Sequence, residues 1–273
     1  MHVCLGFGCC FSRRRFLGFV AVGATAGAVS ACAGDNGLTR ALAPTDQELN
    51  MLGQQTWTDL RQKEKLSTDT AGTQQVDRVA RKVVDASGLG SAYNWEFALF
   101  DSPEVNAFAL PGGRIGVYRG LLQIAQDDAQ LAAVLGHEVT HVANHHAAQR
   151  IGAERAGSLG AQIAQVGLGA SGVTVTPEVA GILGAGVSYG IVLPFSRDQE
   201  YEADSGGLVT MAKAGYDPNA AVTLWQRMAV ENAKQPGQPL EFMSTHPSEA
   251  NRIGRLQQQI PSVMPVYEAA KPA

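Results

Sequence analysis

The sequence predicts an α+β fold that is mainly helical and carries a small β-sheet. Apolar residues follow helical spacing along most of the chain, three short strand-like runs lie between residues 94 and 118, and a helical stretch containing His-Glu-Val-Thr-His follows them. The 273 residues are 45% hydrophobic and 17% charged with a net charge of −4, which suits one soluble globular domain. This mildly acidic balance gives no support to nucleic-acid binding.

Residues 1–31 are expected to be a signal peptide. Arg13, Arg14 and Arg15 precede an uncharged apolar run, residues 16–31, which is shorter than the ~20 residues of a membrane-spanning helix. The stretch 12–17, Ser-Arg-Arg-Arg-Phe-Leu, resembles a twin-arginine export signal. A plain secretory signal and an uncleaved anchor remain the alternatives.

The signal ends in Val-Ser-Ala-Cys, which resembles a lipobox, so Cys32 is the expected lipidation site. An aspartate directly after the lipidated cysteine would favour retention in the inner membrane. Ala33 stands at that position instead, which favours the outer membrane. Cys4, Cys9 and Cys10 would leave with the signal, so we expect no thiol for a disulfide or a metal site.

The mature chain is expected to begin with a tether at residues 32–44, which is rich in small and polar residues. Thr45 or Asp46 then caps a helix that reaches about Leu66. A stripe of valines predicts a second helix, and its members are Val76, Val79, Val83 and Val84. Residues 261–273 are expected to be a C-terminal tail.

Three strands are predicted between these helices and the rest of the chain. Residues 94–100 alternate so that Trp95, Phe97 and Leu99 share one side. Residues 108–110 and 115–118 form two further strands joined through Pro-Gly-Gly, a hairpin signal. The pattern after that is helical almost to the end, without an internal repeat.

The segment from Gly152 to Phe195 is rich in Gly and Ala, and its part from Val179 to Phe195 carries no charge. It could be a mobile cover over a site, a surface that touches a membrane, or loosely packed helices of the core. Repeated glycines and Pro194 disfavour one stable spanning helix, so we favour a cover or core role.

The strongest chemical signal is His137-Glu138-Val-Thr-His141. Asp127 or Asp128 can cap this helix, and on it the two histidines lie one turn apart on one face, so both imidazoles can reach one ion. Glu138 is offset by about 100° from His137, which places it near a water beside the metal without making it a ligand.

A catalytic zinc site usually takes three protein ligands. On a continuous helix, His145 would lie ~12 Å along the axis from His137, too far for a shared ion, and His146 would point elsewhere into solvent. The longer metzincin pattern is excluded, because Asn144 and Ala147 occupy the places of its glycine and its third histidine.

A second helix can supply a carboxylate instead. Ser196 can cap it, Glu200 and Asp204 share one face, and Glu202 points away. On spacing alone, Glu200 is only modestly favoured over Glu202 as a zinc ligand. Asp204 could accept a hydrogen bond from the free nitrogen of a ligating imidazole.

Four motifs in this order resemble peptidase family M48 over about residues 46 to 260. They are His-Glu-Val-Thr-His-Val-Ala at 137–143, Asn-Ala-Phe-Ala-Leu-Pro-Gly-Gly at 106–113, Ser-Arg through Glu to Ala-Asp at 196–204, and Thr-His-Pro-Ser at 245–248 with Arg252. The chain resembles the short bacterial outer-membrane lipoprotein type. The resemblance implies a gluzincin-like metalloprotease domain at residues 45–260, with the His-Glu-x-x-His helix beneath the sheet.

The same resemblance implies roles for particular residues. Glu200 becomes the third ligand of one zinc ion per chain, with Asp204 behind the ligands. Asn106 and Ala107 lie on an edge strand that pairs with the substrate backbone. His246 could stabilise the oxyanion, occupy the fourth metal position in a latent state, or be a helix-cap histidine.

The expected function is that of a zinc-dependent endopeptidase of the bacterial envelope. It would act on unfolded or misassembled envelope polypeptides from the periplasm, anchored by lipid to the inner leaflet of the outer membrane. One alternative is a non-catalytic, zinc-bearing chaperone or assembly factor for outer-membrane proteins. Another is an integral membrane protease that spans through residues 179–195.

Overall fold

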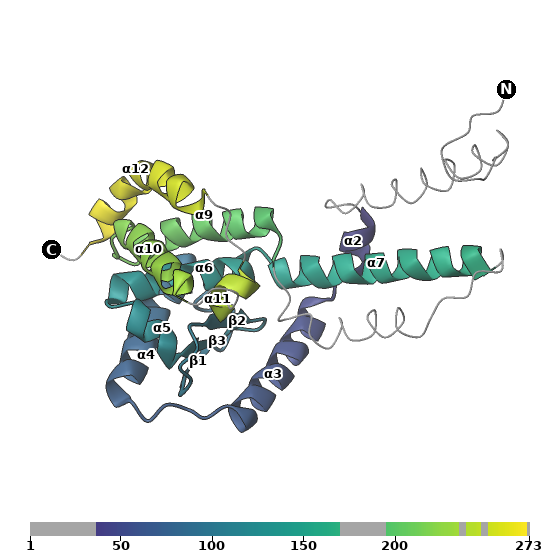
Figure 1. Ribbon diagram of the computed structural model, residues 1–273, viewed down its shortest axis with the longest axis horizontal. Helices are drawn as coiled ribbons and strands as arrows, with labels where there is room; N and C mark the ends of the chain where they lie inside the picture. The colour runs from purple at the N-terminus through teal and green to yellow at the C-terminus, as the bar shows by residue number, and fades with distance from the viewer. Residues whose placement is uncertain (1–36, 170–194, 235–238, 247–250, 272–273) are drawn as a thin grey trace, which may run out of the picture.

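The computed structural model describes residues 37–169, 195–234, 239–246 and 251–271 (Figure 1). The elements are α2 (Gly37–Leu42), α3 (Asp46–Lys63), α4 (Thr70–Ser87), β1 (Glu96–Phe100), β2 (Ala107–Leu110), β3 (Arg114–Tyr118), α5 (Arg119–Ile124), α6 (Asp128–Ala143), α7 (His146–Gly169), α9 (Arg197–Lys213), α10 (Asn219–Ala233), α11 (Glu241–Thr245) and α12 (Arg252–Ala270). A small sheet among many helices confirms the predicted α+β class.

The sheet has the strand order β1-β3-β2, with β1 parallel and β2 antiparallel to β3. The predicted hairpin joins β2 to β3 through Pro111, Gly112 and Gly113. Both glycines have φ of 82°, a left-handed conformation that costs glycine nothing but strains other residues. The hairpin leaves β2 as an edge strand.

Apolar side chains cover both faces of the sheet. On one face, Phe97, Leu99 and Ile115 pack into the main core with α4 and α6, which confirms that the odd-numbered positions of β1 share a side. On the other face, Phe100 packs against Trp57 of α3, with ring centroids 6.0 Å apart. The sheet is therefore held between α3 and the helical body.

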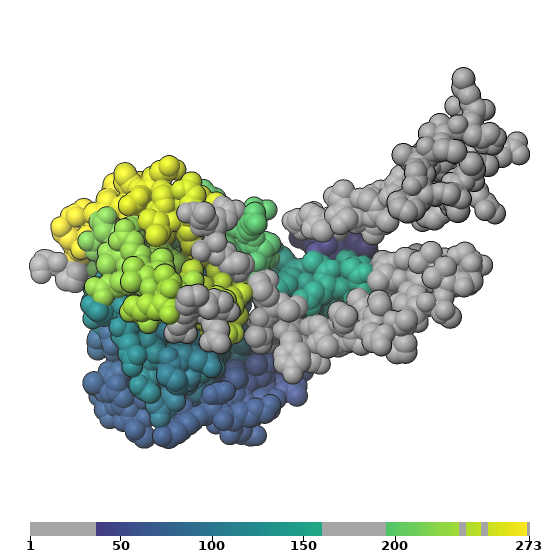
Figure 2. All heavy atoms as spheres, viewed as in Figure 1, coloured from purple at the N-terminus to yellow at the C-terminus, as the bar shows by residue number. Residues whose placement is uncertain are grey.

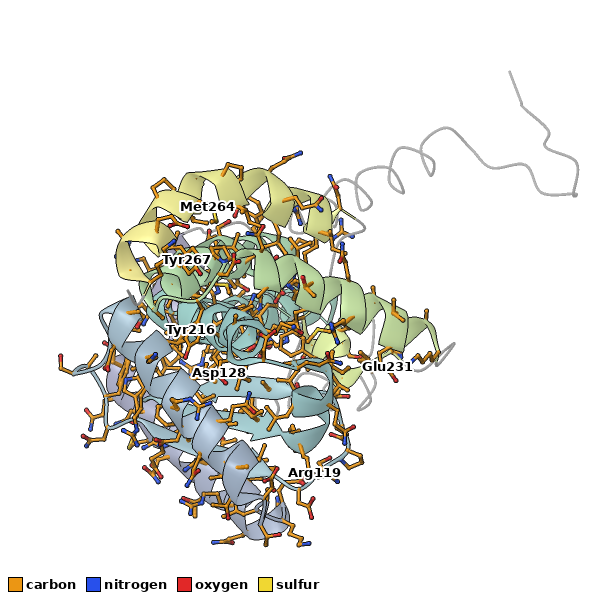
Figure 3. The ribbon with its side chains drawn as sticks, turned by 90° about the vertical axis from the view of Figure 1, so that its left-hand side faces the viewer. Arg119, Asp128, Tyr216, Glu231, Met264 and Tyr267 are labelled. Atoms are coloured by element: carbon orange, nitrogen blue, oxygen red, sulfur yellow. The ribbon has the colours of Figure 1, made fainter. Side chains whose placement is uncertain are left out.

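The helices α6, α9, α10 and α12 lie on one side of the sheet, with α12 farthest from it (Figure 3). Figure 3 shows Met264 and Tyr267 on α12 at one end, Arg119 beside the sheet at the other, and Asp128 between them. Arg78 of α4 pairs with Asp128 at the first turn of α6, with Nη2 and Oδ2 2.9 Å apart. Helix α6 runs through the centre of these helices and contacts α4, α9, α10 and β2.

Helices α6 and α9 approach each other closely through glycine. A Cβ atom added to Gly136 would lie 2.9 Å from the carbonyl oxygen of Gly207, and one added to Gly207 would lie 2.9 Å from the backbone nitrogen of His137. Both atoms belong to backbone and cannot rotate away. The missing side chains therefore allow backbone-to-backbone packing next to His137.

The helix that carries the two histidines ends earlier than a continuous helix would. Helix α6 stops at Ala143, Asn144 is its C-cap, and His145 adopts a φ of 52°. A left-handed residue reverses the local path, so α7 starts afresh at His146 and projects from the body (Figure 2). The continuous helix assumed for residues 137–146 was therefore wrong.

Two further boundaries differ from the predictions. The described part of the predicted tether contains α2, which packs along α7 because Gly152 allows the carbonyl oxygen of Thr39 to approach. The predicted C-terminal tail continues α12 to Ala270, through Pro261 and Pro265, because Val263 extends its buried face. Composition favoured a loop for the tether, and packing of α2 against α7 overrode it, whereas α12 agrees with the helical pattern predicted almost to the end of the chain.

No helix in the described ranges is long and apolar enough to cross a membrane. Of the Gly/Ala-rich segment, residues 152–169 form most of α7. Residues 170–194 lie outside the described ranges, as do the predicted signal peptide and Cys32.

The glycine contact gives a stability prediction. Replacing Gly207 with Ala should lower the free energy of unfolding by about 1–3 kcal/mol, because α6 and α9 must separate to admit a methyl group. Gly157 on α7 is a matched control, since a Cβ there meets nothing within 4 Å. Gly157→Ala should raise helix stability by up to about 1 kcal/mol. Urea unfolding of both variants measures the difference, and equal midpoints would contradict the close-approach argument.

Candidate metal centre

Helix α6 presents His137, Glu138 and His141 to one side of the buried site. Asp127 caps the helix as predicted, accepting a hydrogen bond from the backbone N–H of Gln130 at 2.7 Å. The Nε2 atoms of His137 and His141 are 3.1 Å apart, which confirms that one helical turn brings both imidazoles to one point. All three side chains are buried.

Helix α9 brings Glu200 to the same point. Ser196 and Gln199 form a capping box that starts this helix. The Glu200 carboxylate then places Oε2 3.5 Å from Nε2 of His137 and Oε1 3.6 Å from Nε2 of His141. The structure therefore brings together the two histidines and the glutamate that the sequence selected.

His246 completes a cluster of four potential metal ligands. One ligand atom from each of His137, His141, Glu200 and His246 lies within 4.8 Å of all the others. His246 is the C-cap of α11, stacks on Phe242 with centroids 4.4 Å apart, and places Nε2 3.4 Å from Oε1 of Glu138. Its position is compatible with each role considered for it.

The donor atoms fit a zinc ion. Tetrahedral zinc with ligand atoms at about 2.0–2.1 Å separates those atoms by about 3.3 Å, close to the observed 3.1, 3.5 and 3.6 Å. Both carboxylate oxygens of Glu200, Oε1 of Glu138 and Nε2 of His246 are buried and make no hydrogen bond. Buried polar atoms normally have partners, so their convergence indicates a place for a cation.

Burial sets the protonation of these groups. It lowers the pKa of His137, and lowers the pKa values of His141 and His246 well below the usual range, so the imidazoles are neutral, the form that binds metal. Burial raises the pKa of Glu200 to about 8, although Arg252 opposes it. A cation against this carboxylate would favour its ionised form.

Glu138 is held by the edge strand rather than by the ligands. Its Oε2 accepts a hydrogen bond from the backbone N–H of Ala109 in β2 at 3.1 Å. Burial and the negative charge of Glu200 raise the pKa of Glu138 well above its usual range. Such a carboxylate has the proton affinity of a general base.

Asp204 and Arg252 support His137 from behind. Oδ1 of Asp204 is 3.0 Å from Nδ1 of His137, so an Nδ1–H would leave Nε2 free for a metal. Burial raises the pKa of Asp204, but the charge of Arg252 and hydrogen bonds from His137 and Arg252 outweigh it and leave this pKa lowered. Arg252 itself lies 3.5 Å from the ring centroid of Trp225. The motif resemblance included Arg252, but it gave no sign of these contacts.

His146 is fully buried, which corrects the expectation that it lies in solvent. Its Nδ1 is 2.8 Å from Nδ1 of His141, and its Nε2 is 3.1 Å from Oε2 of Glu202. Glu202 does point away from the ion site, as expected, but it meets His146 there. Asn144, a residue that commonly ends helices, was the sequence signal for the break that turns His146 inward.

The edge strand β2 lies beside α6 and the cluster of potential metal ligands. The carbonyl oxygen of Asn106 accepts from the N–H of Tyr118 of β3 at 3.0 Å, so in this ladder the backbone groups of Ala107 and Ala109 point away from β3, and Ala107 is buried. The side-chain Oδ1 of Asn106 is buried without a hydrogen bond. Of the two predicted substrate-binding residues, Ala107 therefore offers backbone and Asn106 offers a side-chain oxygen.

An aromatic residue that the sequence analysis did not select covers one ligand. Phe195 stacks on His141 with ring centroids 3.8 Å apart and an interplanar angle of 20°. The guanidinium of Arg150 lies over the ring of Phe195, 4.4 Å from its centroid. This stack excludes water from one side of the imidazole.

The fold and this site define a mainly helical, gluzincin-like metalloprotease domain. The family model of Peptidase family M48 matches residues 70–260. The chain belongs to peptidase family M48.

Named relatives come from mitochondria and bacteria. The chain is 40% identical over 189 residues to the mitochondrial metalloendopeptidase OMA1 of Schizosaccharomyces pombe, covering 69% of this chain and 53% of that protein. It is 34% identical over 191 residues to the Homo sapiens protein of that name, covering 67% and 36%. It is 31% identical over 218 residues to a putative beta-barrel assembly-enhancing protease of Vibrio cholerae, covering 76% and 43%. The chain thus spans roughly a third to a half of these relatives.

The cluster predicts which acid on α9 holds the metal. Glu200→Ala should reduce bound zinc from about one ion per chain to well below that, because it removes the carboxylate of the cluster and leaves only the neutral imidazoles of His137, His141 and His246. Asp198→Ala, in the same first turn but exposed, is the control and should retain zinc. Elemental analysis after dialysis measures both. Full zinc occupancy in Glu200→Ala would contradict the ligand set.

Proposed function

We propose that this chain is a zinc-dependent endopeptidase in which His137, His141 and Glu200 hold one zinc ion and Glu138 is the general base. The observation that carries the proposal is the convergence of four buried ligand side chains from α6, α9 and the C-terminal end of α11, among them carboxylate oxygens and an imidazole nitrogen without a hydrogen bond. Two histidines and a glutamate form the ligand set of known zinc hydrolases. Membership in a peptidase family supports the same reaction.

Glu138 moves the proton in this mechanism. A zinc ion in the site would acidify a water and polarise the scissile carbonyl. Oε1 of Glu138 makes no hydrogen bond and faces the cluster, so it can accept the proton of the attacking water. Ala109 holds the other oxygen, which fixes the direction of the carboxylate. The same group then passes the proton to the leaving nitrogen.

His246 lies on the Glu138 side of the cluster. The neutral imidazole with a proton on Nε2 would stabilise the charge that develops on the carbonyl oxygen. With a lone pair on Nε2, it would instead occupy the fourth position in a resting state. Its backbone N–H also caps α11 by donating to the carbonyl oxygen of Phe242 at 2.9 Å, so capping and either site role are compatible.

The substrate backbone would pair with the outer edge of β2. The backbone groups of Ala107 point away from β3 there, although the residue is buried in this structure, and Ala109 links this edge directly to Glu138. A peptide added as a further strand would run past the general base and the ligands. Such pairing uses main-chain atoms and therefore suits endopeptidase action on varied sequences.

We assign the chain to the bacterial envelope as part of this proposal. The signal-like residues 1–31 and Cys32 support a lipid-anchored periplasmic protein, and Ala33 favours the inner leaflet of the outer membrane. The names of the bacterial relatives associate them with beta-barrel assembly. Unfolded or misassembled envelope polypeptides are the proposed substrates.

Replacing Glu138 with Gln tests the mechanism. The variant should retain about one zinc per chain, because Glu138 is no ligand, and casein cleavage should fall at least about 100-fold because the base is lost. Elemental analysis and a casein digestion assay measure the two outcomes. Glu268→Gln, at an exposed position on α12, is the control and should cleave normally.

Two results would contradict the assignment. One is an unchanged cleavage rate in Glu138→Gln, and the other is casein cleavage that persists after a chelator removes the metal. Zinc-loaded protein that suppresses aggregation of an unfolded substrate but never cleaves it would favour the chaperone alternative.

The lipid anchor makes a separate prediction. Cys32→Ala should move the protein from the membrane pellet to the soluble fraction after carbonate extraction, because no acyl chain can be attached. A Cys4→Ala variant is the control, since Cys4 lies within the predicted signal, and it should stay with the membrane. Retention of Cys32→Ala in the pellet would support an integral membrane protease.

A further inference from the structure

His146 is buried immediately after a break between two helices. Its side chain has no exposed surface, whereas the neighbouring His145 is 54% exposed. The left-handed φ of 52° at His145 turns the chain so that His146 faces back toward α6. A non-glycine residue rarely adopts this conformation, and local contacts must compensate for its cost.

The contacts of His146 run in a line from the metal ligand to the surface. Nδ1 of His146 is 2.8 Å from Nδ1 of His141, and Nε2 of His146 is 3.1 Å from Oε2 of Glu202. Asn144 also donates its side-chain N–H to this oxygen of Glu202, at 3.3 Å. The Glu202 side chain is 56% exposed, so the line ends at solvent.

The geometry allows one arrangement of protons for neutral rings. If Nε2 of His141 gives its lone pair to a metal, the ring proton is on Nδ1 and must be donated. Nδ1 of His146 then accepts it, which places the His146 proton on Nε2. That proton is donated to Glu202, so both hydrogen bonds point toward the carboxylate.

His137 has a support of a different kind. Its Nδ1 meets Asp204, whose charge is compensated by Arg252, at the far side of the cluster. His141 has no carboxylate in direct contact at Nδ1 among the described residues. The neutral imidazole of His146, which itself contacts the carboxylate of Glu202, lies at Nδ1 of His141 instead.

We propose that His146 and Glu202 are positioning residues that fix the orientation and proton of His141 and thereby strengthen zinc binding. The proposal rests on the zinc site proposed above. His146 is not itself a fourth ligand in this arrangement, because its two nitrogens face His141 and Glu202, and the four-residue cluster does not include it.

A pair of similarly sized replacements separates hydrogen bonding from packing. His146→Asn retains an acceptor oxygen near the place of Nδ1, whereas His146→Leu fills similar space without one. Zinc affinity, measured by competition with a chromophoric chelator, should fall about 10–100-fold in His146→Leu. His146→Asn should recover most of that loss. The visible absorption of the cobalt-substituted protein should change in His146→Leu, because the imidazole of His141 is free to rotate.

Two controls complete the design. His145→Asn removes the adjacent exposed imidazole but tolerates the left-handed backbone, so its zinc affinity should equal that of the wild type. Glu202→Ala should weaken zinc binding about 10-fold, and Glu202→Gln should weaken it less, because an amide oxygen still accepts the hydrogen bond. Thermal melting with chelator present confirms that each variant folds.

The outcomes distinguish this inference from the proposed function. Wild-type affinity in His146→Leu, or equal losses in His146→Leu and His146→Asn, would overturn the positioning role and leave the zinc site standing. A wild-type protein that binds no zinc would overturn both proposals. If His146→Leu does not fold, wild-type affinity in the Glu202→Ala variant would overturn the role instead.

Discussion

The close approach of α6 and α9 is the constraint on which the site depends. Gly136 and Gly207 permit backbone contact where any side chain would force the helices apart. The metal cluster needs donor atoms from both helices within about 3–4 Å of each other, and zinc–ligand bonds tolerate only a few tenths of an ångström. A methyl group at the contact would shift one helix by more than that tolerance. Stability and metal binding therefore share one structural cause.

Charge balance also ties the site to the interior. Glu200 and Asp204 are buried beside one guanidinium, that of Arg252, and burial together with the charge of Glu200 raises the pKa of Glu138 well above its usual range. A buried carboxylate without compensation is costly, and a divalent cation would compensate it. The aromatic faces of Trp225 and Phe195 exclude water from Arg252 and His141, which strengthens each electrostatic contact.

The sequence was sufficient for features with a local cause. Helical spacing placed His137, Glu138 and His141, alternation placed the β1 side chains, and Pro-Gly-Gly placed the hairpin. Glu200 could be preferred over Glu202 only modestly from spacing, and the family resemblance strengthened that choice. His146 could not be placed, because its burial depends on one left-handed residue and on Glu202, which lies 56 residues along the chain. Helix α2 was missed for a similar reason, since its contact with α7 outweighed local composition.

The outward-facing backbone of β2 has a consequence for selectivity. If substrates pair with β2 as proposed, this edge cannot engage a peptide segment that is already paired within its own sheet or helix, so a folded substrate must first open locally. Cleavage would then follow the population of the open form, and each 1.4 kcal/mol of opening free energy would slow it about tenfold. A segment whose opening costs about 4 kcal/mol would be cut roughly a thousandfold more slowly than an unstructured one. Conformational stability, rather than a sequence motif, would thus distinguish folded proteins, which are spared, from unfolded or misassembled proteins, which are cleaved.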